Sequence, residues 1–136
     1  MAFETIDGGP DEPDWLLSLT AEGERSAARK HWAAITAAMR TADTITAANG
    51  HAIGRLVIAQ TVFDRASAAV ARDGAVRRVK GVDRRNPHWM IMKQANELCS
   101  ELEGQLGLSP RTRHRVGRVV RGVRRSAADK YLRPVK

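Results

Sequence analysis

Residues 86–110 read NPHWMIMKQANELCSELEGQLGLSP, and this stretch decides the fold. It opens with Asn86-Pro87, a capping residue followed by proline at the first helical position, where the missing N–H costs nothing. Apolar residues then recur at three- and four-residue spacing as far as the stop residue Gly107: Ile91, Ala95, Leu98, Leu102 and Leu106, flanked by Met92 and Cys99. The stretch predicts a helix over about residues 87–106, whose apolar stripe must be covered by another helix or another subunit.

Two further helices are predicted upstream. The first begins near Thr20, a good N-cap residue, and runs to about Thr41. The second runs from a cap at Thr46 to Asp73, with Gly74 as its stop. We expect the two to pack as an antiparallel hairpin through apolar stripes formed by Ala28, Trp32, Ile35 and Met39 in the first and Ile53, Leu56, Val57, Phe63 and Val70 in the second.

Residues 75–85, AVRRVKGVDRR, break the helical period. Their composition predicts either an extended basic loop or a short β-hairpin that turns at Lys80-Gly81. The cluster lacks aromatic residues, so base stacking is not indicated, and phosphate contact and ordinary solvation are both open interpretations. Its cations are Arg77, Arg78, Lys80, Arg84 and Arg85, of which we predict Arg77, Arg78 and Lys80 as DNA contacts.

The pair Ser109-Pro110 predicts a fourth helix. On a helical wheel its valines, including Val116 and Val120, lie opposite a broad face of arginines. Duplex DNA carries one charge per about 1.7 Å of axis and suits such a face. A merely solvated arginine face is the alternative, and a membrane-surface helix is disfavoured because the valine face lacks aromatic anchors. The predicted DNA contacts here are Arg111, Arg113, Arg115, Arg118, Arg121, Arg124 and Arg125.

Composition divides the 136 residues into three parts. We predict a flexible acidic arm over residues 1–14, a helical oligomerisation core over 15–109, and a basic C-terminal helix and tail over 110–136. The net charge is +8, from 23 basic against 15 acidic residues. Alanine, the best helix former, is abundant, so the chain is expected to be mainly α-helical. Large apolar residues are few, so we expect a thin core that self-association completes.

Several function classes lack sequence support. No phosphate-binding loop or nucleophile elbow occurs, and the four histidines lack metal-ligand spacing, so we expect neither an enzyme nor a cofactor or metal site. The single cysteine, Cys99, lies on an apolar stripe and reads as a buried, inert thiol. With no long apolar run and an acidic start, a cytosolic protein with no membrane partner is expected.

The run from Asn86 to Val116 resembles the C-terminal signature of phage terminase small subunits: an Asn-Pro helix start, an apolar-striped helix, then L-G-L-[ST]-P and a nearby arginine. Here the signature is residues 106–110, LGLSP, with Arg113. The resemblance implies a non-catalytic component that recognises viral DNA in the bacterial host cytoplasm. It also implies a ring-shaped homo-oligomer that delivers DNA to a large terminase subunit holding the ATPase and nuclease.

Two alternatives stay open at this point. One is a nucleoid-type or regulatory DNA-binding protein without a packaging role. The other is a helical protein-interaction module whose arginines contact an acidic partner.

Overall fold

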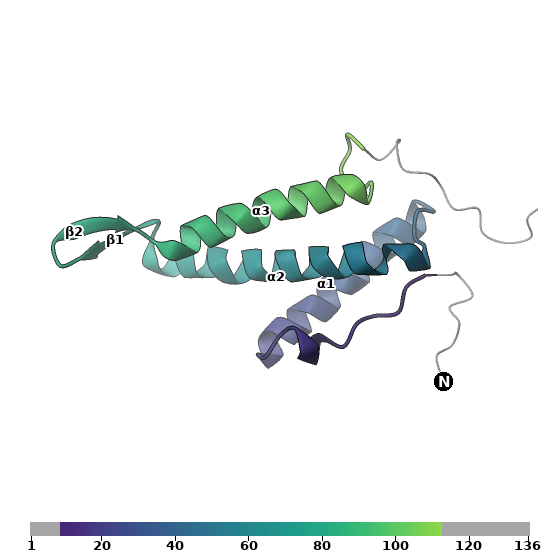
Figure 1. Cartoon of the computed structure of the whole chain (residues 1–136), viewed down its shortest axis with the longest axis horizontal. Coiled ribbons are helices and arrows are strands. Elements are labelled where there is room, and N and C mark those ends of the chain that lie inside the picture. Colours follow the sequence, from purple (N-terminus) through teal and green to yellow (C-terminus); the bar gives the residue numbers. More distant parts are fainter. Residues whose placement is uncertain (1–8, 113–136) are drawn as a thin grey trace, which may run out of the picture.

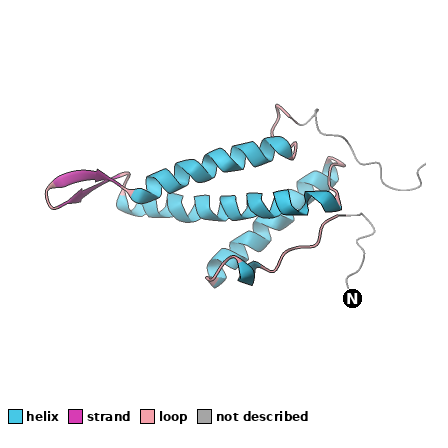
Figure 2. Cartoon of the chain, viewed as in Figure 1, coloured by secondary structure: helices cyan, strands magenta, loops and turns pink. Residues whose placement is uncertain are grey.

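The computed structural model describes residues 9–112, which form an elongated helical body with a β-hairpin at one end (Figure 1). Figure 2 shows the helices in cyan and the two strands in magenta. The elements in chain order are the 3-10 helix η1 (Trp15–Leu17), α1 (Glu22–Thr41), the 3-10 helix η2 (Ala47–Asn49), α2 (Gly50–Asp73), β1 (Val76–Val79), β2 (Val82–Arg85) and α3 (Pro87–Gln105).

The second helix, α2, is the centre of the molecule. It packs against α3 on one side and against α1 on the other. The β1–β2 hairpin joins α2 to α3, which run antiparallel side by side, whereas α1 crosses α2 (Figure 1). We expected α1 and α2 to pack as an antiparallel hairpin. They do pack, but α1 crosses α2 (Figure 1), and the more extensive antiparallel contact is between α2 and α3, because the apolar stripe on a helix does not say which neighbour covers it.

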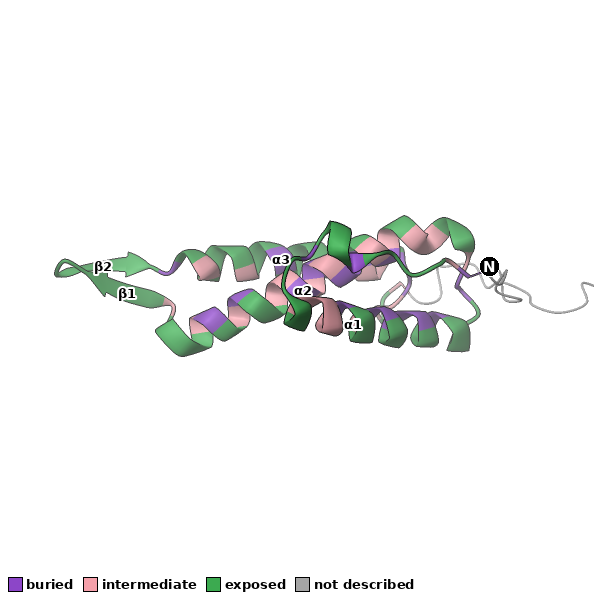
Figure 3. Ribbon diagram, turned by 90° about the horizontal axis from the view of Figure 1, so that it is seen from below, coloured by how far each residue is buried: buried purple, intermediate pink, exposed green. Residues whose placement is uncertain are grey.

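The core is a narrow layer along α2, coloured purple on the facing sides of the helices in Figure 3. Trp15 of η1 packs edge to face on Trp32 of α1, with ring centroids 6.0 Å apart. The Trp15 indole N–H also donates to a carboxylate oxygen of Glu12 at 2.8 Å, which ties the N-terminal segment to the core. The buried apolar side chains of the three long helices include Ala28, Trp32, Ile35, Met39, Ile53, Leu56, Val57, Ala59, Ala95, Cys99 and Leu102.

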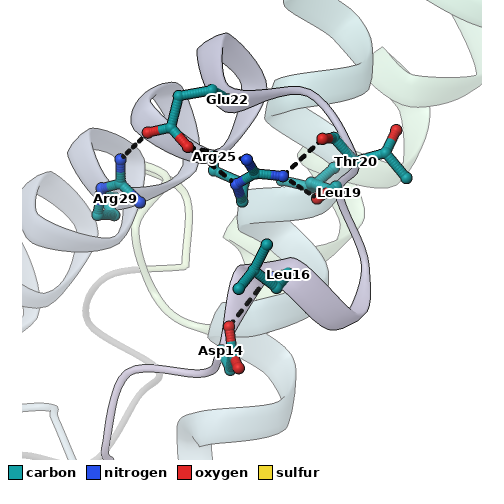
Figure 4. A network of polar contacts seen from close by, with 7 residues as sticks. All are labelled: Asp14, Leu16, Leu19, Thr20, Glu22, Arg25 and Arg29. Carbon is teal, nitrogen blue, oxygen red and sulfur yellow. Dashed lines mark hydrogen bonds and ion pairs between the residues drawn. The ribbon is translucent and has the colours of Figure 1, made fainter.

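A polar network holds the segment that connects η1 to α1 against the first turns of α1 (Figure 4). The Arg25 guanidinium donates to the carbonyl oxygens of Leu19 and Thr20, at 3.0 and 2.6 Å, and to the Glu22 carboxylate at 2.9 Å. The predicted N-cap at Thr20 is therefore wrong. The N-cap residue is Ala21, which makes no side-chain cap bond, and the backbone carbonyl of Thr20 accepts a hydrogen bond from Arg25.

The start of α2 also differs from the prediction in detail. The chain turns helical directly after Thr46, as predicted, but as η2 before α2 begins at Gly50. Two side-chain contacts then connect α2 to α1: a hydrogen bond between His31 Nε2 and an Asp64 carboxylate oxygen at 2.7 Å, and an ion pair between Arg65 and Glu24 at 2.9 Å.

The third helix ends in a Schellman motif at Gly107, the residue predicted as its stop. Gly107 has φ 71°, and its N–H donates to the Gly104 carbonyl at 3.2 Å. The Leu108 N–H donates to the Glu103 carbonyl at 2.9 Å, and the Leu108 side chain packs on the core.

The apolar stripe of α3 was predicted wrongly in part. Ala95, Cys99, Leu102 and Leu106 are buried, but Ile91 and Leu98 are 38% and 44% exposed. The buried row of α3 is therefore Ala95, Cys99 and Leu102, at four- and three-residue spacing, and Ile91 and Leu98 lie at its edge.

The predicted acidic arm and the predicted fourth helix are each described only in part. Residues 9–14 lie against α2, with Pro10 beside Gly50 and Pro13 beside Gly54, while residues 1–8 of the predicted acidic arm lie outside the described range. After Ser109-Pro110 the chain forms one turn, in which the Thr112 N–H donates to the Ser109 carbonyl at 3.2 Å. The remainder of the predicted fourth helix, from residue 113, lies outside the described residues.

Within residues 9–112, no helix is long and apolar enough to cross a membrane.

Candidate nucleic-acid interface

The basic segment between α2 and α3 is a β-hairpin, the second of the two predicted alternatives. Val79 lies opposite Val82, so that Lys80 and Gly81 form a two-residue loop. Their φ angles are 52° and 77°. Two successive positive φ values are typical of the turn whose twist matches the strands it connects, and glycine accepts the second without strain.

Asn86 anchors the base of the hairpin. Its side chain is fully buried, and its carbonyl oxygen accepts from the His88 N–H at 3.0 Å, which caps α3. Its amide nitrogen donates to the Gly74 carbonyl at 2.8 Å, at the end of α2. Its backbone N–H donates to the Ala75 carbonyl at 2.8 Å. One residue therefore ties together the end of α2, the hairpin and the start of α3.

The hairpin is a concentrated positive surface that extends beyond the helical body (Figure 1). Every residue from 76 to 85 is exposed, as the continuous green of the hairpin in Figure 3 shows. Asp83 is the single acid among these ten residues. The five cations of the hairpin form no ion pair with any carboxylate among residues 9–112. The cations are Arg77, Arg78, Lys80, Arg84 and Arg85.

The acid that precedes the hairpin in the sequence is already paired with its neighbouring arginine. Asp73, the last residue of α2, lies 3.0 Å from the Arg72 guanidinium, and this hydrogen bond lowers the pKa of Asp73. Burial opposes this shift, and the positive charges of Arg72 and, less strongly, of Arg77 in the hairpin lower the pKa of Asp73 further.

The strand register separates the hairpin into two faces. Alternate residues of a strand point to opposite faces, and directly opposite partners share one. Arg77 is opposite Arg84 and Val79 is opposite Val82, which makes one face purely cationic and apolar. We name it the Arg77–Arg84 face. The other face carries Arg78 opposite Asp83, and Val76 opposite Arg85.

The structure brings some predicted contact residues together and separates others. Arg77, Arg78 and Lys80 lie on the same hairpin. Arg111 is exposed at the far end of α3, a helix of 19 residues and therefore about 28 Å long. Arg84, which the prediction left out, lies directly opposite Arg77; the turn at Lys80-Gly81 already implied this register. The other predicted contacts lie outside the described residues: Arg113, Arg115, Arg118, Arg121, Arg124 and Arg125.

An apolar groove of about 550 Å³ lies between α2, α3 and the N-terminal segment. Ile58 and Val62 of α2 and Ile91 and Leu98 of α3 line it. Cys99 is buried in the core, and burial, followed by the charges of Glu103 and Asp64, raises the pKa of its thiol. Among residues 9–112, no three His, Cys, Asp or Glu side chains gather as a metal site would require.

Comparison with known families decides the identity of the chain. A family model described as "Phage terminase, small subunit" matches residues 28–121. The chain belongs to this family. A search of curated proteins and a search of solved structures found no significant match. In this terminase small subunit, the matched region contains the hairpin, the buried Asn86 and the LGLSP end of α3.

Proposed function

We propose that this terminase small subunit binds duplex DNA during phage genome packaging, without catalysing a reaction itself. In this proposal the β1–β2 hairpin and the C-terminal arginines contact phosphates, and the protein delivers the DNA to the large subunit that holds the ATPase and nuclease. Family membership supports the packaging role.

The observation that carries the DNA proposal is the unneutralised charge of the hairpin. Five cations stand against one acid on an exposed element, and none of the five has an ion-pair partner among residues 9–112. Placing such cations on DNA releases condensed counterions, which is the main source of affinity in sequence-independent binding. The hairpin lies outside the core, so DNA can approach it from either face.

Self-association is the second part of the proposal. The core is a thin layer, and the groove between α2 and α3 leaves Ile91 and Leu98 exposed. A second copy that covers this groove would bury apolar area that one chain leaves in water. A head-to-tail contact of this kind closes into a ring when its rotation closes.

A salt titration of binding tests the DNA proposal. The affinity of the full chain for a labelled duplex is measured by fluorescence anisotropy over a range of salt concentrations. Replacing Arg77, Arg78 and Lys80 together with alanine should weaken binding and make the log–log salt slope shallower by about 2.7, or 0.9 for each lost phosphate contact. Reversing Arg115, Arg118 and Arg121 to glutamate tests the C-terminal contacts in the same way.

The matched control removes charge elsewhere. Lys30 on α1 and Lys93 on α3 are exposed, and replacing both with alanine should leave the salt slope unchanged. If the unmodified protein fails to shift duplex DNA even at low salt, the DNA proposal is wrong and a protein-interaction module is favoured. If it binds DNA but has no effect on the ATPase of the large subunit, the packaging role is wrong and a nucleoid-type protein is favoured.

A further inference from the structure

We propose that Arg77 and Arg84 form a clamp for a single phosphate of the DNA backbone, with Val79 and Val82 packed on the adjoining deoxyribose. This inference rests on the proposed DNA-binding function and specifies which hairpin face meets the DNA. The cations of the other face, Arg78 and Arg85, would then contact different phosphates independently.

The clamp follows from the strand register. Arg77 and Arg84 are direct cross-strand partners, and the Cβ atoms of such partners lie about 5 Å apart. Both side chains extend from the same face, so their guanidinium groups can reach one anion from two sides. Each guanidinium offers several N–H donors in a planar fork that suits phosphate oxygens.

In the free protein, the pairing of Arg77 with Arg84 lowers the stability of the hairpin. Like charges directly opposite each other destabilise an antiparallel pair, and an isolated two-stranded hairpin is only marginally stable in water. The other face avoids this cost, because Asp83 lies opposite Arg78. A phosphate held between Arg77 and Arg84 supplies the missing negative charge, so this arrangement favours the bound state over the free one.

The valines complete the same face. Val79 and Val82 are 42% and 55% exposed, next to the two arginines and nearer the turn. The major groove of duplex DNA is about 12 Å wide and admits a two-stranded ribbon. A ribbon that enters with this face toward the groove wall places the arginines on a phosphate and the valines on sugar.

A double-mutant cycle tests the clamp in the full chain, again by anisotropy with a labelled duplex. Arg77→Ala and Arg84→Ala should each lower affinity about 10-fold, the typical effect of losing a charged hydrogen bond. The double variant should lose little more than either single variant, because one arginine alone no longer closes the clamp. Its salt slope should become shallower by about 0.9, the value for one phosphate.

The comparison pair lies on the other face. Arg78→Ala and Arg85→Ala should act additively, since these residues are not direct partners. Additive losses on both faces would overturn the clamp and leave a diffuse basic surface, while DNA binding would stand. Failure of the unmodified protein to bind duplex DNA would instead overturn the proposed function.

A charge reversal separates clamp loss from misfolding. Arg77→Glu places opposite charges across the strands, so the melting temperature of the free protein should stay the same or rise while DNA affinity falls. A lowered melting temperature would contradict the repulsion on which the clamp depends.

Discussion

At the residue scale, Asn86 should contribute strongly to stability, because its side chain is fully buried and hydrogen-bonds to the end of α2 and the start of α3. We predict that Asn86→Ala lowers the free energy of unfolding by about 2–3 kcal/mol, through loss of the α3 cap and of the partner of the Gly74 carbonyl. Asn86→Ser, which retains a capping oxygen, should lose less. Chemical denaturation measures both.

The matched control for this residue lies on the same helix. Asn96 is exposed on α3, and Asn96→Ala should change stability by less than about 0.5 kcal/mol. An equal loss in the two alanine variants would show that the Asn86 contacts contribute nothing specific.

At the element scale, two glycines near the end of α3 should respond oppositely to the same substitution. Gly107 has φ 71°, and Gly107→Ala should destabilise by about 1–2 kcal/mol because alanine resists this conformation. At Gly104, a Cβ would meet only Thr112 Cγ2 at 4.0 Å, so Gly104→Ala should stabilise by up to about 1 kcal/mol. Thermal unfolding that moves both variants in one direction would refute the capping argument.

At the scale of the whole molecule, the exposed apolar residues of the α2–α3 groove should control self-association. Leu98→Lys places a charge in the groove and should shift the protein toward smaller species in light scattering and sedimentation. Ser100→Lys, at an exposed position of α3 that does not line the groove, is the control and should leave the assembly intact. Identical masses for the two variants would place the subunit contact elsewhere.

The sequence predicted where α2 ends and where α3 begins and ends better than it predicted which helices pack against each other. Asn86-Pro87, Gly74 and Gly107 act through local backbone geometry, which each residue carries wherever the chain folds. Which apolar row of α3 faces inward depends on α2, and the periodicity could not distinguish Leu98 from Cys99. At the site, the sequence predicted the cations, and a turn at Lys80-Gly81 as one of two alternatives. The pairing of Arg77 with Arg84 was not predicted, although a turn at that place implies it. The arginines beyond residue 112 stay a prediction.

Because the hairpin is separate from the core, its residues should tolerate substitution during evolution. Every residue from 76 to 85 is exposed, and the buried cluster is built entirely from the helical elements and their connections. Most substitutions fail by reducing stability below a threshold, and residues outside the core seldom do so. Substitutions in the hairpin can therefore change the chemistry of its exposed surface, while Asn86 and the helical core that hold the hairpin in place stay the same.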